Sequence, residues 1–122
     1  MTKILLAEDD LFLRDIYTEI LQNENFEIAI AKDGKEALEK IKEGGWDLVL
    51  LDVIMPQMSG IEVLKSIKDI PPSNLAHHII FMTNIDEAKN LEEISDLTEG
   101  YILKSFVTPD QFVAKIKEIL AK

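Results

Sequence analysis

The stretch KILLAEDDLFL, from Lys3 to Leu13, changes character twice. Its first part, KILLA (Lys3–Ala7), is apolar and has the length of a short buried strand, and from Leu11 the apolar residues recur at the spacing of a helix. Between the two patterns stand three consecutive carboxylates: Glu8, Asp9 and Asp10. Neighbouring negative charges repel one another, and each costs free energy to bring near a core. The stretch therefore predicts a strand, a charged turn at its carboxyl end and a helix, with negative charge that needs a partner.

The same alternation continues along the chain. Four further apolar runs have the pattern of strands: FEIAIA (Phe26–Ala31), DLVLLD (Asp47–Asp52), HIIFMT (His78–Thr83) and GYILK (Gly100–Lys104). Helical patterns begin at Leu11, after a cap at Asp33, after the loop MPQMSG (Met55–Gly60), roughly over 86–97, and after TPDQ (Thr108–Gln111). Five strands alternating with five helices predict an α/β fold, in which a doubly wound parallel sheet has helices on both faces.

The bulk composition limits the classes of function. The 122 residues are enough for one domain with a single core. The formal net charge of −10 disfavours nucleic acid and anionic membranes as direct partners, because both attract positive surfaces. Cysteine is absent, so disulfide and thiolate chemistry are excluded, and no apolar run approaches the length of a membrane span. A soluble cytoplasmic protein without a signal peptide is therefore expected.

Polar side chains follow four of the five predicted strands. In open α/β sheets ligands bind at the carboxyl ends of the strands, and these ends carry Glu8 and Asp9, Asp52, Thr83, and Lys104. Three converging carboxylates favour a hard divalent cation such as Mg²⁺, which binds carboxylates, waters and phosphate. A lysine ammonium and a threonine hydroxyl can hold phosphoryl oxygens beside it. Together these groups have the chemistry needed to accept a phosphoryl group on a carboxylate.

Four short motifs carry a resemblance to a known family: AEDD (7–10), LLDVIMPQMSG (50–60), MTN (82–84) and GYILKS (100–105). With these motifs the chain resembles the receiver domain of bacterial two-component response regulators, in particular the stand-alone chemotaxis type. Each motif alone is weakly specific, whereas the set in this order is highly specific, and the match covers essentially the whole chain. The resemblance implies a flavodoxin-like five-stranded sheet in the order 2-1-3-4-5, and a single receiver domain over residues 1–122 with no output domain.

The resemblance also assigns roles to the acidic residues. It makes Asp52 the phosphoacceptor. Asp9 and Asp52 would bind Mg²⁺ directly, together with the backbone carbonyl of Ile54, and Glu8 would act largely through metal-bound water. Asp10, just before the first helix, is expected to be a helix cap instead.

Three further residues take roles from the same resemblance, and two positions depart from the family pattern. Thr83 and Lys104 would bind phosphoryl oxygens, and Tyr101 stands where the family has its switch aromatic. Receivers usually have a small residue after the threonine and a proline after the lysine, joined through a cis bond, whereas this chain has Asn84 and Ser105. A cis bond without proline costs about 2.5–4 kcal/mol, which favours a trans bond and a rearranged loop after the lysine.

As a receiver, the chain would take a phosphoryl group from the phosphohistidine of a sensor histidine kinase or a phosphotransfer protein. Phosphorylation would change a protein-binding surface for a downstream target protein, without direct contact to nucleic acid or membrane. The chain would be a monomer or a phosphorylation-dependent dimer. It would not be a turnover enzyme, although its acyl phosphate would later hydrolyse.

Other classes of function stay open. A receiver-like interaction module that is never phosphorylated is compatible with Asn84 and Ser105. A Mg²⁺-dependent phosphatase with an aspartyl-phosphate intermediate usually has a second aspartate two residues after its nucleophile, where this chain has Ile54. A P-loop ATPase is disfavoured, because neither GxxxxGKS nor GxxxxGKT occurs.

Overall fold

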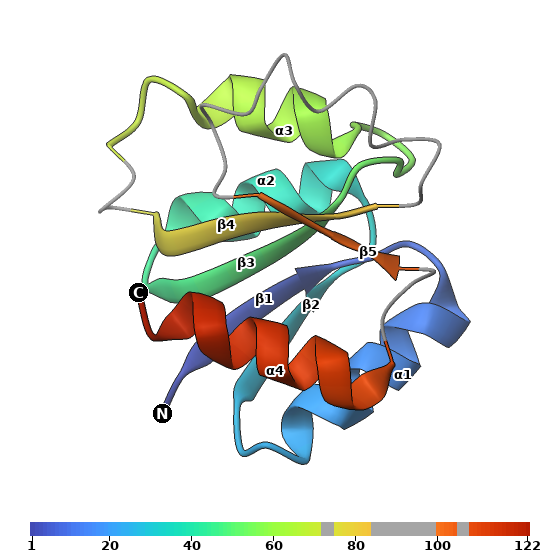
Figure 1. Cartoon of the computed structure of the whole chain (residues 1–122). Coiled ribbons are helices and arrows are strands. Elements are labelled where there is room, and N and C mark those ends of the chain that lie inside the picture. Colours follow the sequence, from blue (N-terminus) through green and yellow to red (C-terminus); the bar gives the residue numbers. More distant parts are fainter. Residues whose placement is uncertain (72–74, 84–99, 105–107) are drawn as a thin grey trace.

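A computed structural model covers the chain and describes residues 1–71, 75–83, 100–104 and 108–122. Within these ranges five strands form one parallel sheet in the order β2-β1-β3-β4-β5 (Figure 1). The strands are β1 (Lys3–Ala7), β2 (Glu27–Ala31), β3 (Trp46–Asp52), β4 (Ala76–Thr83) and β5 (Tyr101–Leu103). The predicted α/β class, the parallel pairing and the strand order are confirmed.

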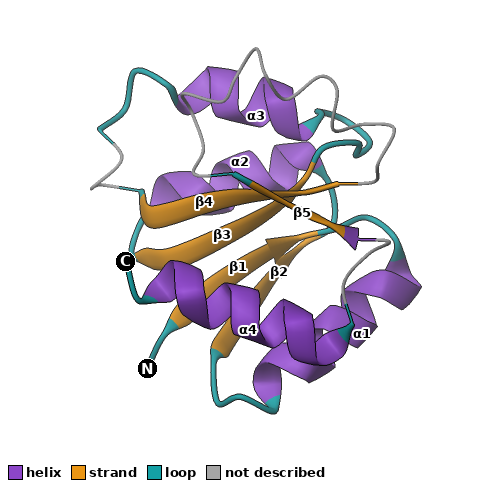
Figure 2. Cartoon of the chain, viewed as in Figure 1, coloured by secondary structure: helices purple, strands orange, loops and turns teal. Residues whose placement is uncertain are grey.

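Four helices lie within the described residues and cover the two faces of the sheet (Figure 2). They are α1 (Leu11–Gln22), α2 (Gly34–Glu43), α3 (Gly60–Ile67) and α4 (Pro109–Leu120). α1 and α4 pack on one face, and α2 and α3 pack on the other. The prediction of five helices is met for these four, and the helix expected over 86–97 falls outside the described residues. In the described part of the chain, no helix has the length and apolar content needed to cross a membrane.

Each described helix begins at a side chain that caps its first turn. The carboxylates of Asp10 and Asp33 each accept a backbone N–H of the turn that follows, at 3.0 and 2.8 Å. Ser59 and Thr108 form reciprocal capping boxes at the starts of α3 and α4. Such caps satisfy N–H groups that have no partner inside the helix, and each typically contributes about 1 kcal/mol. Asp10 is therefore a cap, as predicted.

Apolar residues at alternate positions of β1 and β3 face opposite sides of the sheet and form two cores. One set faces α2 and α3: Leu5, Val49 and Leu51. The other set faces α1 and α4: Ile4, Leu6, Leu48 and Leu50. Both faces of these strands are covered, which explains their continuous apolar runs. Because full burial of each such side chain contributes roughly 1.5–3 kcal/mol, the two central strands are firmly held, and so are the residues at their ends.

Strand boundaries differ from the predicted ones by one or two residues. β3 and β4 both begin earlier, because Trp46 pairs with Ala76 beyond the apolar runs. β2 begins one residue later, because the Phe26 N–H donates to the Leu21 carbonyl in the turn after α1 (3.4 Å). β5 is shorter than predicted by one residue at each end. None of these differences moves the carboxyl ends of the three central strands.

Candidate functional site

The carboxyl edge of the sheet brings three acidic side chains together. β1 and β3 are neighbours in register, so Glu8, just past the end of β1, stands level with Asp52. One carboxylate oxygen from each of Glu8, Asp9 and Asp52 lies within 4.8 Å of the others. Glu8 and Asp52 are 2% and 5% exposed, whereas Asp9 is exposed to solvent. The three residues, called the acidic cluster below, therefore form a buried negative site with one open side.

Lys104 reaches the acidic cluster from β5, the outermost strand of the sheet. Its ammonium donates to Glu8 Oε1 at 2.6 Å and to Asp52 Oδ2 at 2.9 Å, and its side chain is buried. Lys104 directly follows β5, so its side chain passes the end of β4 to meet residues that follow β1 and end β3. One ammonium thus serves two buried carboxylates, and Asp9 adds a third negative charge beside them.

Burial has the largest influence on the protonation of Asp52. It raises the pKa of the Asp52 carboxyl from 3.8 to about 8; the Glu8 carboxyl acts in the same direction, and Lys104 opposes both. For Lys104, burial lowers the pKa, but the bonds to the two carboxylates outweigh burial, so the pKa of this ammonium lies above its usual value. At neutral pH and without a bound cation, Lys104 is therefore charged while a large part of the Asp52 population is protonated.

The donor set of the acidic cluster fits a hard divalent cation. Mg²⁺ prefers oxygen ligands at about 2.0–2.1 Å in an octahedral arrangement that keeps several waters. One oxygen of each of the three carboxylates lies within 4.8 Å of the others, so the three would face a common hydrated ion. The exposed side at Asp9 leaves access for waters and for a phosphoryl group. A cation here favours the ionised form of Asp52 and so reverses the effect of burial on its pKa.

The predicted backbone ligand, Ile54, lies two residues after Asp52 in the loop that leads to α3. Its side chain is 61% exposed, while its neighbours Val53 and Met55 are buried. The base of this loop is closed by a hydrogen bond from the Gly60 N–H to the Val53 carbonyl at 2.7 Å. The loop is therefore tied to β3 on both sides of Ile54, and the role of the Ile54 carbonyl as a metal ligand stays a prediction.

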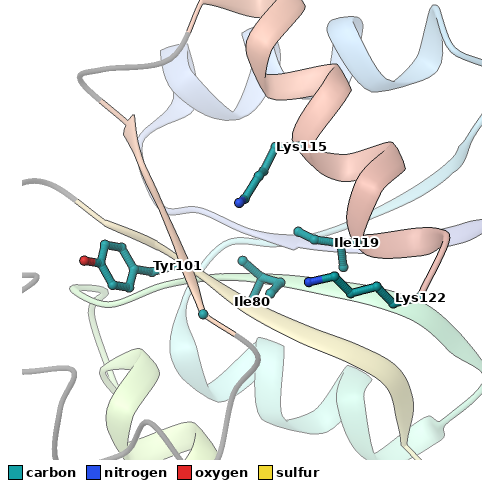
Figure 3. A pocket seen from close by; sticks show the side chains of 6 residues that line it. Ile80, Tyr101, Lys115, Ile119 and Lys122 are labelled. Carbon is teal, nitrogen blue, oxygen red and sulfur yellow. The ribbon is translucent and has the colours of Figure 1, made fainter.

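The residues predicted to respond to phosphorylation lie on the two strands beyond β3. Thr83 is fully buried at the end of β4. Tyr101 is 46% exposed, and Figure 3 shows its ring on the opposite side of β5 from the Lys115 and Lys122 amines. Next to it is a hollow of about 80 Å³ lined by Ile80, Gly100, Tyr101, Lys115, Ile119 and Lys122. The switching roles of Thr83 and Tyr101 stay predictions.

The two positions that depart from the family pattern, Asn84 and Ser105, lie outside the described residues. So does the bond between Lys104 and Ser105, whose trans form stays a prediction. The Lys104 ammonium nevertheless reaches both buried carboxylates without a proline after it.

Two residues next to the acidic cluster were not among the predicted site residues. Tyr17 of α1 is buried and packs on Phe112 of α4, with ring centroids 5.1 Å apart. Burial raises the pKa of the Tyr17 hydroxyl, and the charge of Lys104 lowers it, so this hydroxyl lies within electrostatic reach of the cluster. A Cβ at Gly60 would overlap the Asp52 carbonyl oxygen, so glycine lets α3 begin directly against the end of β3. In the sequence, the position of Tyr17 indicates only a residue of the helix that faces the core, and the position of Gly60 indicates only the end of a loop.

Known proteins resemble the chain over most of its length. The family model of the response regulator receiver domain matches residues 4–117. The chemotaxis protein CheY of Halobacterium salinarum is 38% identical over 109 residues, which are 88% of this chain and 88% of CheY. The transcriptional regulatory protein ResD of Bacillus subtilis is 35% identical over 122 residues, 99% of this chain and 49% of ResD. The chain therefore spans about half the length of this regulator.

Solved structures share the fold. The response regulator TrrA of Thermotoga maritima, solved in complex with Mg²⁺-BeF, has a TM-score of 0.83 at 36% identity, covering 98% of this chain and 99% of that one. A CheY-like receiver domain protein from Methanospirillum hungatei has a TM-score of 0.85 at 32% identity, covering 99% and 94%. Receiver domains are signalling switches that bind Mg²⁺ at an acidic pocket, which here consists of Glu8, Asp9 and Asp52. By its family match, its relatives and its fold, the chain belongs to the response regulator receiver domains of two-component systems.

Proposed function

We propose that this receiver domain is a phosphoacceptor switch in which Asp52 carries the phosphoryl group. The observation that supports the proposal most is that Glu8, Asp9 and Lys104 lie around the buried carboxyl of Asp52. The donor is the phosphohistidine of a sensor histidine kinase or a phosphotransfer protein, or a small acyl phosphate. The exchange takes place in the cytoplasm, and the phosphorylated state presents a changed surface to a downstream target protein.

Transfer requires the ionised form of Asp52. One carboxylate oxygen attacks phosphorus in line with the leaving group, an O–P bond forms as the P–N bond of phosphohistidine breaks, and the leaving nitrogen keeps the electron pair and the imidazole is protonated. Asp9, Asp52 and the Ile54 carbonyl would hold Mg²⁺ directly and Glu8 would hold it largely through metal-bound water, and the ion would supply positive charge to the phosphoryl oxygens and favour the ionised form of Asp52. Water later cleaves the acyl phosphate, which releases inorganic phosphate and restores the carboxylate.

Lys104 exchanges one of its two partners when the phosphoryl group is transferred. Before transfer its ammonium is shared between Glu8 and Asp52, at 2.6 and 2.9 Å. Transfer moves the negative charge of Asp52 outward onto the phosphoryl group, so the ammonium keeps Glu8 and bonds a phosphoryl oxygen in place of the carboxylate. Thr83, buried at the neighbouring strand end, donates its hydroxyl to another phosphoryl oxygen.

Tyr101 carries the change to the surface. As Thr83 moves toward the phosphoryl group, the exposed Tyr101 ring turns inward behind it, and the surface formed by β5 and α4 changes. The hollow with the Lys115 and Lys122 amines belongs to this surface (Figure 3). It offers positive charge on a chain whose net charge is −10, which suits an acidic segment of the target. Phosphorylation needs only to favour one of two conformations that exist beforehand.

Incubation with acetyl phosphate and Mg²⁺ tests the proposal. Wild-type protein is expected to form a phosphoryl adduct that hydroxylamine removes, and Asp52→Asn is expected to form none. Asp47→Asn, at the other end of β3, is the matched control and keeps the wild-type rate. Wild-type protein that binds Mg²⁺ without forming an adduct would be an interaction module instead, and sustained turnover of phosphate esters would indicate a phosphatase.

A further inference from the structure

We infer that Gly34, the first residue of α2, is a positioning residue for the metal site. It holds the loop after Asp52 in the conformation that presents the Ile54 carbonyl. The inference rests on the proposed function, in which this carbonyl is a Mg²⁺ ligand. Gly34 acts through its contact with Pro56 and Met58 of the loop, and not through contact with the phosphoryl group.

The loop contains a tight and strained turn. The Met58 N–H donates to the Pro56 carbonyl at 2.8 Å, and Gln57 between them has a φ of 72°. This pattern is a γ-turn of the rare kind with a positive φ at its central residue, which is strained for a residue that has a side chain. Strained backbone persists only where the surrounding structure holds it. The turn therefore needs a rigid neighbour.

Gly34 is that neighbour. Its N–H, one of the donors without a partner in the first turn of a helix, donates to the same Pro56 carbonyl at 3.3 Å. A Cβ on Gly34 would overlap both the carbonyl oxygen and the Cβ of Met58. Helix and loop therefore meet backbone to backbone, and only glycine allows so close an approach.

A methyl group on Gly34 would displace the loop rather than the helix. α2 is anchored through Ala37 and Ile41, which are fully buried in the core shared with α3. Pro56 and Gln57 are exposed and Met58 is only partly buried, so the turn yields more readily than the buried face of the helix. Ile54 lies only two residues before Pro56, so the displacement reaches the carbonyl that is proposed to bind the metal.

The experiment compares two glycine-to-alanine variants of the full chain. Gly34→Ala places a methyl group against the loop. Gly45→Ala is the matched control, because Gly45 has a φ of +82° and no atom within 4 Å of an added Cβ, so the change strains the backbone without touching a neighbour. Gly45 also precedes β3, at the opposite edge of the sheet from the acidic cluster. Calorimetric titration measures Mg²⁺ affinity, urea unfolding verifies folding, and acetyl phosphate measures the rate of adduct formation at saturating Mg²⁺.

Gly34→Ala is expected to bind Mg²⁺ about tenfold more weakly than wild type, with most of the adduct rate restored at saturating Mg²⁺, whereas Gly45→Ala keeps wild-type affinity. Unchanged affinity in Gly34→Ala, or an equal loss in Gly45→Ala, overturns the inference. If Gly34→Ala does not fold in buffer alone, the same comparison is made in trimethylamine N-oxide, which favours the folded state, and wild-type affinity there overturns the inference. Wild-type protein that binds no Mg²⁺ overturns the proposed function, and the inference with it.

Discussion

β3 carries an aspartate near each end, and the surroundings of the two differ. Asp47 is partly exposed, accepts the Lys3 backbone N–H at 2.8 Å and lies 3.9 Å from His77 Nδ1. Asp52, the last residue of the strand, is buried and shares one lysine ammonium with Glu8. An aspartate on the same strand is therefore hydrogen-bonded and partly hydrated at one end, and is buried beside two other carboxyl groups at the other.

The carboxyl end of β3 is short of positive charge. There the carboxyl groups of Glu8, Asp9 and Asp52 meet Lys104, so three acidic groups share one ammonium. A buried charge without a partner costs several kcal/mol, so this end is stable only when a carboxyl is protonated or a cation arrives from outside. A site with this imbalance is one where a bound cation or a phosphoryl group changes the energy of the protein most.

The largest expected effect comes from removing the lysine at the carboxyl end. Lys104→Gln leaves Glu8 and Asp52 buried without an ammonium, and we expect a loss of about 2–4 kcal/mol in the free energy of unfolding in EDTA, because protonation of Asp52 offsets part of the cost. Mg²⁺ is expected to recover part of this loss. Urea denaturation in EDTA and in Mg²⁺ measures both effects.

Lys40→Gln is the control for that experiment. Lys40 pairs with Glu36 one turn away on α2 at 3.9 Å, with both side chains partly exposed. Such helix pairs contribute only about 0.2–0.5 kcal/mol, so the control is expected to lose no more than that. Equal losses in Lys104→Gln and Lys40→Gln would show that the carboxyl end is not short of positive charge.

The same substitution is expected to change the free energy of unfolding in opposite directions at the two ends of β3. In EDTA, Asp52→Asn raises the free energy of unfolding by about 1–2 kcal/mol, because Lys104 then serves Glu8 alone. Asp47→Asn lowers it by about 0.5–1 kcal/mol, because a charge-assisted hydrogen bond to the Lys3 N–H becomes a neutral one. Urea unfolding of both variants checks the signs, and a shift of the same sign in both would count against the comparison.

Counted per pH unit, the expected dependence of the free energy of unfolding on pH is a smaller effect. Because the pKa of Asp52 is raised from 3.8 to about 8 in the folded protein, the stability that its protonated form contributes is complete below about pH 4 and is lost as the pH rises through 8. Metal-free wild type is therefore expected to be less stable at pH 8.5 than at pH 5, by at most about 1.4 kcal/mol per pH unit. Asp52→Asn is expected to have a shallower slope. Urea midpoints across this range measure both slopes, and parallel slopes would refute the assignment.

Much of the fold could be predicted because β1 and β3 are buried on both faces and so appear as unbroken apolar runs. The helix starts were equally visible, since Asp33 and Thr108 are capping residues at the expected positions. The early start of β3 and β4 could not be predicted, because the Trp46–Ala76 pair belongs to the ladder and not to an apolar pattern.

The meeting of Glu8, Asp9 and Asp52 could also be predicted, since parallel strands end at the same edge of a sheet. Their charge balance could not, because it depends on how far the Lys104 side chain reaches and on how deeply each carboxylate is buried. The contact of Gly34 with the loop was hidden for a similar reason. It joins two backbones across the fold, whereas the residues next to Gly34 in the chain indicate only a capped helix start.

Titration with Mg²⁺ tests most directly whether the carboxyl end of β3 needs a cation from outside the protein. Calorimetry on wild type is expected to show one site, with the same affinity in Asp47→Asn and binding at least about tenfold weaker in Asp52→Asn. A wild-type protein that does not bind Mg²⁺, or equal affinities in the two aspartate variants, would show that the carboxyl end of β3 does not need an external cation.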